Sequence, residues 1–235
     1  MGCALRAAEL IRALAVGSAS VLDVGCATGH FLRTFTRERL PLSKYVGLEI
    51  DPGMVAAARD VWAGEITAGG AEFINGDLET FESARKYDFV ICVNAFMYFA
   101  SAKMALKNLM AAARGRVLVR SYFADANYRI VRAQTTLNHD KSAVEEIDVF
   151  DESGDMLCYD FWNIYSQTYI EAVVAKIDGS AKIEWLDDKN VLSSMAKERE
   201  LSVKKRGATE LLDGHEVSYP FILPWKYLSI SVSDA

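Results

Sequence analysis

Residues 21–32 read Val-Leu-Asp-Val-Gly-Cys-Ala-Thr-Gly-His-Phe-Leu, and this is the most informative stretch of the 235-residue chain. It predicts a buried apolar strand that breaks into a glycine loop, with Asp23 two positions ahead of the first glycine. Gly25 and Gly29 lack a Cβ atom, so the backbone can approach a ligand closely there. The helix expected next offers unpaired N–H groups and the positive end of its dipole. We therefore expect a small, partly anionic ligand at this loop.

An acid stands at or just past the end of each of the next two predicted strands. Residues 44–50 form a second apolar strand that includes Glu49 near its end. This acid lies about twenty residues after the loop, the distance at which an acid binds ribose hydroxyls in doubly wound nucleotide-binding folds. Residues 72–78 contain a third, short strand, and Asp77 lies just past it. The ordered combination of loop, Glu49 and Asp77 is more specific than any one of these elements alone.

Together these elements resemble the class I S-adenosylmethionine-dependent methyltransferases, over residues 19–122 and more weakly in a later helix and the terminal strands. The resemblance implies that the loop holds the methionine half of the cofactor, that the acid after the second strand binds the ribose, and that the acid after the third contacts the adenine amino group. It implies cofactor-binding roles for Asp23, Gly25, Cys26, Ala27, Gly29, Glu49, Ile50, Gly76, Asp77, Leu78, Asn94 and Ala95. Ala27 departs from the family, which often has glycine at the centre of the loop.

Apolar strands alternate with amphipathic helices, which predicts an α/β fold. We expect a doubly wound, Rossmann-like, seven-stranded and mostly parallel sheet with helices on both faces. Asp51 followed by Pro52 predicts a helix N-cap with proline at the first helical position. Further helices are expected at 4–16, 29–39 and 166–177, and further strands at 87–93, 116–121, 182–186 and 218–232.

The pattern changes after the fifth predicted strand. Residues 122–165 are polar and rich in aromatic side chains, and they predict a lid-like insertion over the active site, with a hairpin at 147–161. The aromatic rings are suited to walling a small-molecule pocket. The alternative is that they form a satellite core beneath the lid. We expect residues 1–235 to form one domain that carries this insertion.

Composition limits the partners of the chain. It has 51 % hydrophobic and 25 % charged residues, as ordinary soluble globular proteins do. A net charge of −6 argues against nucleic acid as a partner, because proteins that bind nucleic acid usually present a basic surface. The one basic cluster, residues 204–206, is interpreted as a solvated loop.

Cysteine usage and the apolar segments predict a cytoplasmic protein with no membrane partner. The cysteines at positions 3, 26, 92 and 158 lack metal-ligand spacing, and their contexts favour free thiols in a reducing compartment. Arg6, Glu9 and Arg12 interrupt the first apolar run, which therefore does not match a signal peptide. The longest apolar stretch, residues 89–100, is too short to span a bilayer. We expect no metal site.

Methyl transfer from a sulfonium is an in-line displacement that needs an aligned nucleophile and little water, and no metal. The segment after the fourth predicted strand, residues 94–98, lacks both an acidic cluster and the motif of enzymes that methylate base amines. A hydroxyl acceptor calls for a general base, and His139 is the candidate by elimination among three histidines. Tyr98 is the candidate to face the substrate. The alternatives are an ordinary surface role for His139 and simple packing for Tyr98.

We therefore expect transfer of the methyl group of S-adenosylmethionine to oxygen or nitrogen of a small molecule, such as a sugar or a natural-product intermediate. An NAD-dependent dehydrogenase shares the glycine loop and the ribose acid, but Asp23, Ala27 and Asp77 favour the methyltransferase. An aminopropyl transferase is disfavoured because no acidic segment follows the fourth predicted strand. A non-catalytic S-adenosylmethionine-binding protein stays open because the general base is uncertain. No pattern indicates the oligomeric state.

Overall fold

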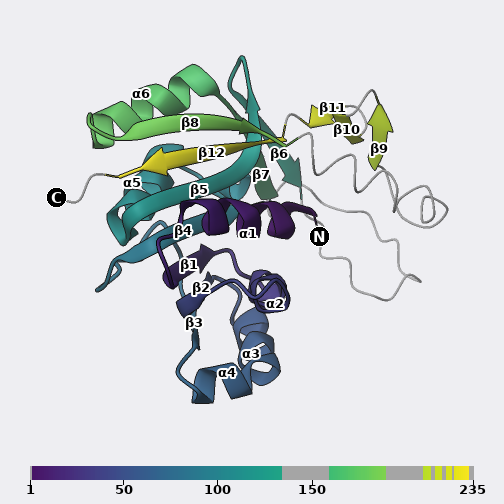
Figure 1. Ribbon diagram of the computed structural model, residues 1–235. Helices are drawn as coiled ribbons and strands as arrows, with labels where there is room; N and C mark the ends of the chain where they lie inside the picture. The colour runs from purple at the N-terminus through teal and green to yellow at the C-terminus, as the bar shows by residue number, and fades with distance from the viewer. Residues whose placement is uncertain are drawn as a thin grey trace, which may run out of the picture.

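A computed structural model describes residues 2–133, 159–188, 209–212, 215–218, 221–223 and 225–232. Helices and strands alternate along most of the described chain (Figure 1). In chain order the elements are α1 (Gly2–Leu14), β1 (Ala19–Val24), α2 (His30–Arg37), β2 (Leu42–Glu49), α3 (Pro52–Val61), α4 (Ala63–Thr67), β3 (Ala71–Asn75), β4 (Tyr87–Val93), the 3₁₀ turn η1 (Phe96–Tyr98), α5 (Ala102–Ala112), β5 (Ala113–Ala124), β6 (Tyr128–Ala133), β7 (Tyr159–Ser166), α6 (Gln167–Ile177), β8 (Lys182–Asp187), β9 (Thr209–Leu212), β10 (His215–Ser218), β11 (Phe221–Leu223) and β12 (Trp225–Ser231).

The main sheet runs in the order β3-β2-β1-β4-β5-β12-β8. The first five strands of this order are parallel to their neighbours, whereas β12 is antiparallel to both β5 and β8. The strands β6 and β7 pair with each other, and β7 also pairs with the end of β5, so the sheet has nine strands in all. The prediction of an α/β fold with a mostly parallel sheet is confirmed, and two strands join the seven that the sequence led us to expect.

Helices cover both faces of the sheet because its strands are apolar on both sides. Successive residues of β1 point to opposite faces, so Val21 packs into one core and Leu22 into the other. The Val21 core includes α1, α2 and α3, and the Leu22 core includes α5 and α6. This arrangement leaves the ends of the strands as the edge of the sheet where a ligand can enter.

The start of α3 follows the predicted capping chemistry. Asp51 Oδ1 accepts hydrogen bonds from the backbone N–H groups of Gly53 and Met54, at 2.7 and 3.0 Å. Pro52 occupies the first helical position, where its missing N–H costs nothing. Asp51 is therefore a helix cap, as expected, and α3 begins immediately after β2.

The segment predicted as an insertion contributes strands to the sheet where it is described. The strand β6 pairs antiparallel with β7, with Tyr128 opposite Ile164 and Ala133 opposite Tyr159. Most of the hairpin expected at 147–161 lies outside the described residues. The strand expected at 218–232 is divided in the structure: β11 pairs with β10 in a separate three-stranded sheet, and β12 joins the main sheet as an antiparallel strand. Pro224, which has no N–H to donate, separates β11 from β12 in the sequence.

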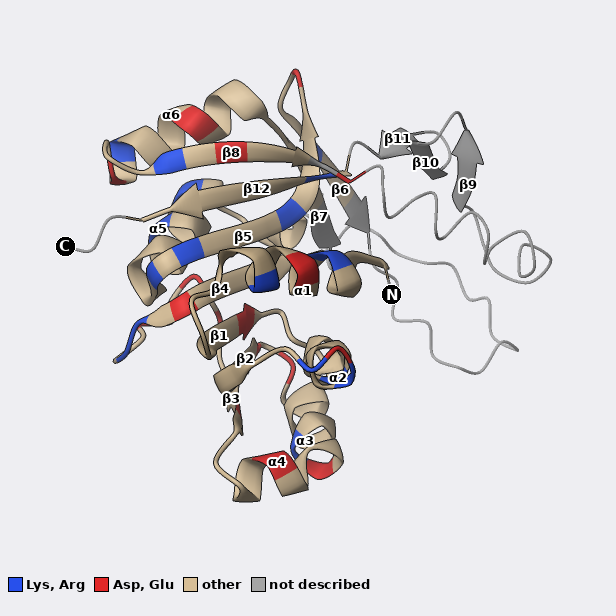
Figure 2. Ribbon diagram, viewed as in Figure 1, with Lys and Arg blue, Asp and Glu red and all other residues tan. Residues whose placement is uncertain are grey.

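Three arginines lie along β5, within an otherwise largely apolar sheet, and the strand carries blue segments in Figure 2. Each is paired. Arg114 donates two hydrogen bonds to Asp88, and Arg116 Nη1 donates to Ser229 Oγ at 2.9 Å. Arg120 forms an ion pair with Asp188, with Nη2 2.6 Å from Oδ2. The sheet thus tolerates these cations because each guanidinium group has a hydrogen-bonding or ion-pair partner on a neighbouring segment.

Candidate active site

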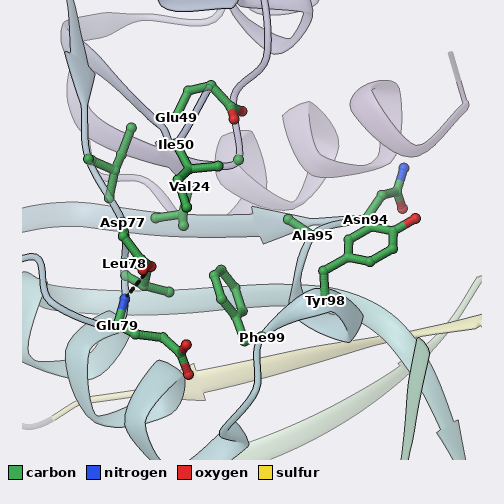
Figure 3. A pocket seen from close by; sticks show the side chains of 13 residues that line it. Val24, Glu49, Ile50, Asp77, Leu78, Glu79, Asn94, Ala95, Tyr98 and Phe99 are labelled. Carbon is green, nitrogen blue, oxygen red and sulfur yellow. Dashed lines mark hydrogen bonds between the residues drawn. The ribbon is translucent and has the colours of Figure 1, made fainter. Parts of the chain in front are cut away.

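A cavity of about 380 Å³ opens at the carboxyl ends of β1, β2, β3 and β4 (Figure 3). The strand order reverses between β1 and β4, and in open parallel sheets the loops on either side of such a point diverge and leave a crevice. The volume is within the range of small-molecule sites. The lining consists of Val24, Gly25, Leu48, Glu49, Ile50, Gly76, Asp77, Leu78, Glu79, Asn94, Ala95, Tyr98 and Phe99.

The structure brings most of the sequence-predicted residues to this cavity. Those that line it are Gly25, Glu49, Ile50, Gly76, Asp77, Leu78, Asn94, Ala95 and Tyr98. Four expected cofactor residues, Asp23, Cys26, Ala27 and Gly29, do not line it. His139 lies outside the described residues.

The glycine loop has the backbone conformation that its sequence predicts. Gly25 and Gly29 have φ angles of 75° and 78°, in the left-handed region that favours glycine. A Cβ atom on Gly25 would lie 2.6 Å from the Cβ of Ala95, so the absence of a side chain lets the segment after β4 approach the loop. Ala27 also has a positive φ, 46°, which explains why glycine is the easier residue at this position.

Gly29 has a packing role instead of a lining role. It is the N-cap of α2, and a Cβ atom there would lie 2.6 Å from Trp62 Nε1 and 2.9 Å from the Phe73 ring. Trp62 Nε1 donates to the carbonyl oxygen of Thr28 at 3.0 Å. The absence of a side chain at Gly29 therefore lets the indole of Trp62 pack against the glycine loop.

Glu49 connects the glycine loop to β2. Its Oε2 accepts a hydrogen bond from the backbone N–H of Ala27 at 2.9 Å, and its Oε1 accepts one from the N–H of Asp51 at 3.1 Å. A carboxylate oxygen can accept more than one hydrogen bond, so both oxygens keep capacity for ligand hydroxyls. The two amides fix the carboxylate at the cavity wall, which suits the recognition of a pair of neighbouring hydroxyls.

Asp77 lies at the opposite end of the cavity from Asn94 and Tyr98 in Figure 3. Its Oδ1 accepts a hydrogen bond from the N–H of Glu79 at 2.9 Å, drawn as the dashed line in the figure. This local turn fixes the carboxylate while leaving its other oxygen available. Ile50, which is 65 % exposed, offers apolar surface on the same cavity.

Asp23 is part of the core, and this location changes its interpretation. Its side chain is 1 % exposed and accepts a hydrogen bond from the Tyr45 hydroxyl at 2.5 Å. Burial raises the pKa of Asp23 to about 7, although the hydrogen bond from Tyr45 opposes the rise. Burial likewise raises the pKa of the Cys26 thiol well above its ordinary value. Neither residue is among those that line the cavity.

Four lining residues were missed by the sequence analysis. Val24, Leu48 and Phe99 contribute apolar wall, and Glu79 Oε1 accepts from the N–H of Ser101 at the start of α5. Each of the four is adjacent in sequence to a predicted site residue. Val24 and Leu48 lie at the ends of parallel strands, and this position is the signal that would have found them, whereas Glu79 and Phe99 lie in the segments that follow β3 and β4.

Two further properties concern the described residues. None of their helices is long and apolar enough to cross a membrane. No cluster of three or more His, Cys, Asp and Glu side chains among them could hold a metal ion.

The chain has detectable relatives. Residues 21–115 match a family model described as a methyltransferase domain. Over 79 residues the chain is 37 % identical to malonyl-[acyl-carrier protein] O-methyltransferase of Acetivibrio thermocellus, a match that covers 34 % of this chain and 26 % of that protein. The match therefore spans only about a quarter of the length of this curated relative.

Solved structures share the fold over nearly the whole chain. The O-methyltransferase from the trans-AT PKS multienzyme of Brevibacillus brevis, in complex with S-adenosyl-L-homocysteine, superposes with a TM-score of 0.60 at 14 % identity, covering 99 % of this chain and 72 % of that one. CalS10, an amino pentose methyltransferase of Micromonospora echinaspora with bound S-adenosylmethionine, gives a TM-score of 0.55 at 17 % identity, covering 97 % and 89 %.

The matched residues 21–115 contain the glycine loop, Glu49, Asp77 and the segment after β4, which together form the cavity. Residues 21–115 of the chain thus form a methyltransferase domain, and over these residues the predicted family, the class I S-adenosylmethionine-dependent methyltransferases, is confirmed. The cofactor of this class is S-adenosylmethionine.

Proposed function

We propose that the protein transfers the methyl group of S-adenosylmethionine to oxygen or nitrogen of a small molecule. The observation that carries the proposal is the convergence of Gly25, Glu49, Asp77 and Asn94 on one cavity at the carboxyl ends of β1 to β4. In this proposal Asp77 contacts the adenine, Glu49 binds the ribose hydroxyls, and Gly25 with Asn94 holds the methionine end.

The residues of the cavity fit this cofactor chemically. The Glu49 carboxylate keeps acceptor capacity for two hydroxyls, and Asp77 offers an oxygen to an amino group. Val24, Leu48 and Phe99 supply apolar wall that excludes water. When bound, S-adenosylmethionine supplies a methyl group on an already activated carbon, so the remaining task of the chain is to align the acceptor.

We propose that the acceptor enters beside Tyr98, at the end of the cavity where Asn94 also lies. Tyr98 is 47 % exposed, so part of its ring and hydroxyl can meet a second ligand. For a hydroxyl acceptor we propose His139 as the general base, whereas a neutral amine needs none. The similarity to an amino pentose methyltransferase supports a small-molecule acceptor, and the O-methyltransferases among the relatives leave both oxygen and nitrogen open as the acceptor atom.

We further propose that residues 1–235 act as one domain in a reducing, cytoplasmic setting, with 122–165 forming part of the acceptor site. Support for the last point comes from Asn163 on β7, whose Nδ2 donates to the carbonyl oxygens of Met97 and Phe99 at 2.8 and 3.0 Å. These contacts attach the segment to the wall that carries Tyr98. The free, buried thiols of Cys26 and Cys92 are typical of a reducing compartment.

The proposal is tested by release of S-adenosylhomocysteine from S-adenosylmethionine across a panel of small hydroxyl and amine acceptors. We expect turnover with at least one class and loss of that turnover in Tyr98→Ala. Asp60→Ala, which removes an exposed side chain on α3 that does not line the cavity, is the control. Binding of the cofactor with no turnover of any acceptor, and no methylated product by mass spectrometry, would favour the non-catalytic alternative.

A further inference from the structure

A buried cation contacts Asn94, one of the residues that line the cavity. Arg120 on β5 is 5 % exposed, and its Nε donates to Asp188 Oδ2 at 2.7 Å. Its Nη1 donates to the side-chain oxygen of Asn94, and its Cζ lies 3.8 Å from the centroid of the Trp225 ring. A buried guanidinium is tolerated only when its donors are well matched, so this geometry fixes Arg120 tightly.

The residue that Arg120 contacts has an unusual backbone conformation. Asn94 has a φ angle of 64°, although it is not a glycine, and such a conformation persists where the surroundings enforce it. The N–H of Asn94 donates to the carbonyl oxygen of Arg120 at 3.0 Å, and its Nδ2 lies 3.7 Å from the sulfur of Cys3 on α1. Arg120 therefore contacts Asn94 through both its backbone and its side chain.

The partners of Arg120 come from the far half of the chain. Asp188 directly follows β8, and Trp225 begins β12. Arg120, Asp188 and Trp225 all lie outside the residues 21–115 that match the methyltransferase domain. The cluster thus joins the antiparallel side of the sheet to the cavity built by the matched domain.

We propose that Arg120 is a positioning residue, which, held by Asp188 and Trp225, fixes the left-handed turn at Asn94 and so shapes the methionine end of the cofactor site. The inference rests on the proposed function, because it assigns that end of the cavity to the methionine moiety. Arg120 acts through Asn94 and does not itself contact the cofactor.

A double-mutant cycle on S-adenosylhomocysteine affinity, measured by calorimetry, tests this role. Arg120→Met keeps the backbone hydrogen bond to Asn94 and removes the side-chain bond, so we expect affinity to fall about tenfold. Asn94→Gly suits the positive φ and deletes the same bond, with a similar fall expected. If Arg120 acts through Asn94, the double variant also falls about tenfold, whereas independent contributions would multiply to about a hundredfold.

Arg116 provides a matched control on the same face of β5. It also contacts β12, through Ser229, and its Nη1 lies 3.9 Å from Glu184 Oε2 on β8. Among the described residues, Arg116 does not line the cavity and has no hydrogen bond to a residue that does. Arg116→Met is expected to lower the melting temperature without changing the affinity. Arg120→Gln, a milder change, replaces Arg120→Met if the latter fails to fold.

The outcomes separate the two claims. Arg120 variants that bind S-adenosylhomocysteine as tightly as the wild type, or losses that multiply in the double variant, overturn the positioning role and leave the proposed function intact. A wild-type protein that does not bind S-adenosylhomocysteine overturns the proposed function, and the positioning role falls with it.

Discussion

Replacement of Glu49 by alanine should weaken cofactor binding far more than it weakens the fold. In the proposed site the carboxylate accepts hydrogen bonds from two ribose hydroxyls, and loss of two bonds to a charged acceptor costs about 2–4 kcal/mol. That cost corresponds to a rise of about 30- to 1000-fold in the dissociation constant. Calorimetric titration with S-adenosylhomocysteine measures it without turnover.

The effect of the same substitution on stability is smaller because of where the two protein donors lie. The hydrogen bond from the N–H of Asp51 is exposed, so this N–H can bond to water instead, whereas the hydrogen bond from the N–H of Ala27 is partly buried. Losing the acceptor of one partly buried donor costs about 1 kcal/mol of unfolding free energy. Asp60→Ala should change neither quantity. A dissociation constant within about threefold of the wild-type value, with the fold intact, would refute the role of Glu49.

Other substitutions around the loop have effects that follow from its backbone and burial. Gly25→Ala should lower the unfolding free energy by about 1–3 kcal/mol in urea titrations, because its Cβ would meet Ala95 at 2.6 Å and φ is 75°. Ala27→Gly should raise the unfolding free energy by about 0.5 kcal/mol, because relief of the positive φ outweighs the added freedom of the unfolded chain. An unfolding free energy below that of the wild type would contradict this. Asp23→Asn, which can still accept from Tyr45, should change the pH dependence of stability. Because burial raises the folded-state pKa of Asp23 from 3.8 to about 7, its ionisation makes the wild type lose stability as pH rises through this interval. The stability of the variant relative to wild type should therefore increase from pH 5 to pH 8, and a constant difference would refute the assignment.

The parallel half of the sheet and most of its ligand edge could be predicted because their determinants are local. An apolar strand followed by a glycine or an acid places that residue at the carboxyl end of the sheet, as Gly25, Glu49 and Asp77 illustrate. The capping role of Asp51 needed only its own sequence neighbours. Two of the lining residues that were missed, Val24 and Leu48, are adjacent to Gly25 and Glu49.

The remainder depends on contacts between distant parts of the chain. Asp23 was assigned to the ligand from its motif, but its side chain faces the hydroxyl of Tyr45 on the neighbouring strand, inside the core. The pairing of Arg120 with Asp188 spans 68 residues, and no periodicity indicates it. The strands β6 and β7 were not predicted from the sequence, because their polar and aromatic residues do not show the continuous apolar pattern of the parallel strands.

The measurement that tests the central claim most directly is a parallel calorimetric titration of the purified protein with S-adenosylmethionine, S-adenosylhomocysteine and NAD. We expect micromolar binding of the first two, which share the adenosine and amino-acid groups that the cavity is proposed to hold, and no binding of NAD. Binding of NAD alone, or of none of the three, would contradict the assignment of this cavity to S-adenosylmethionine.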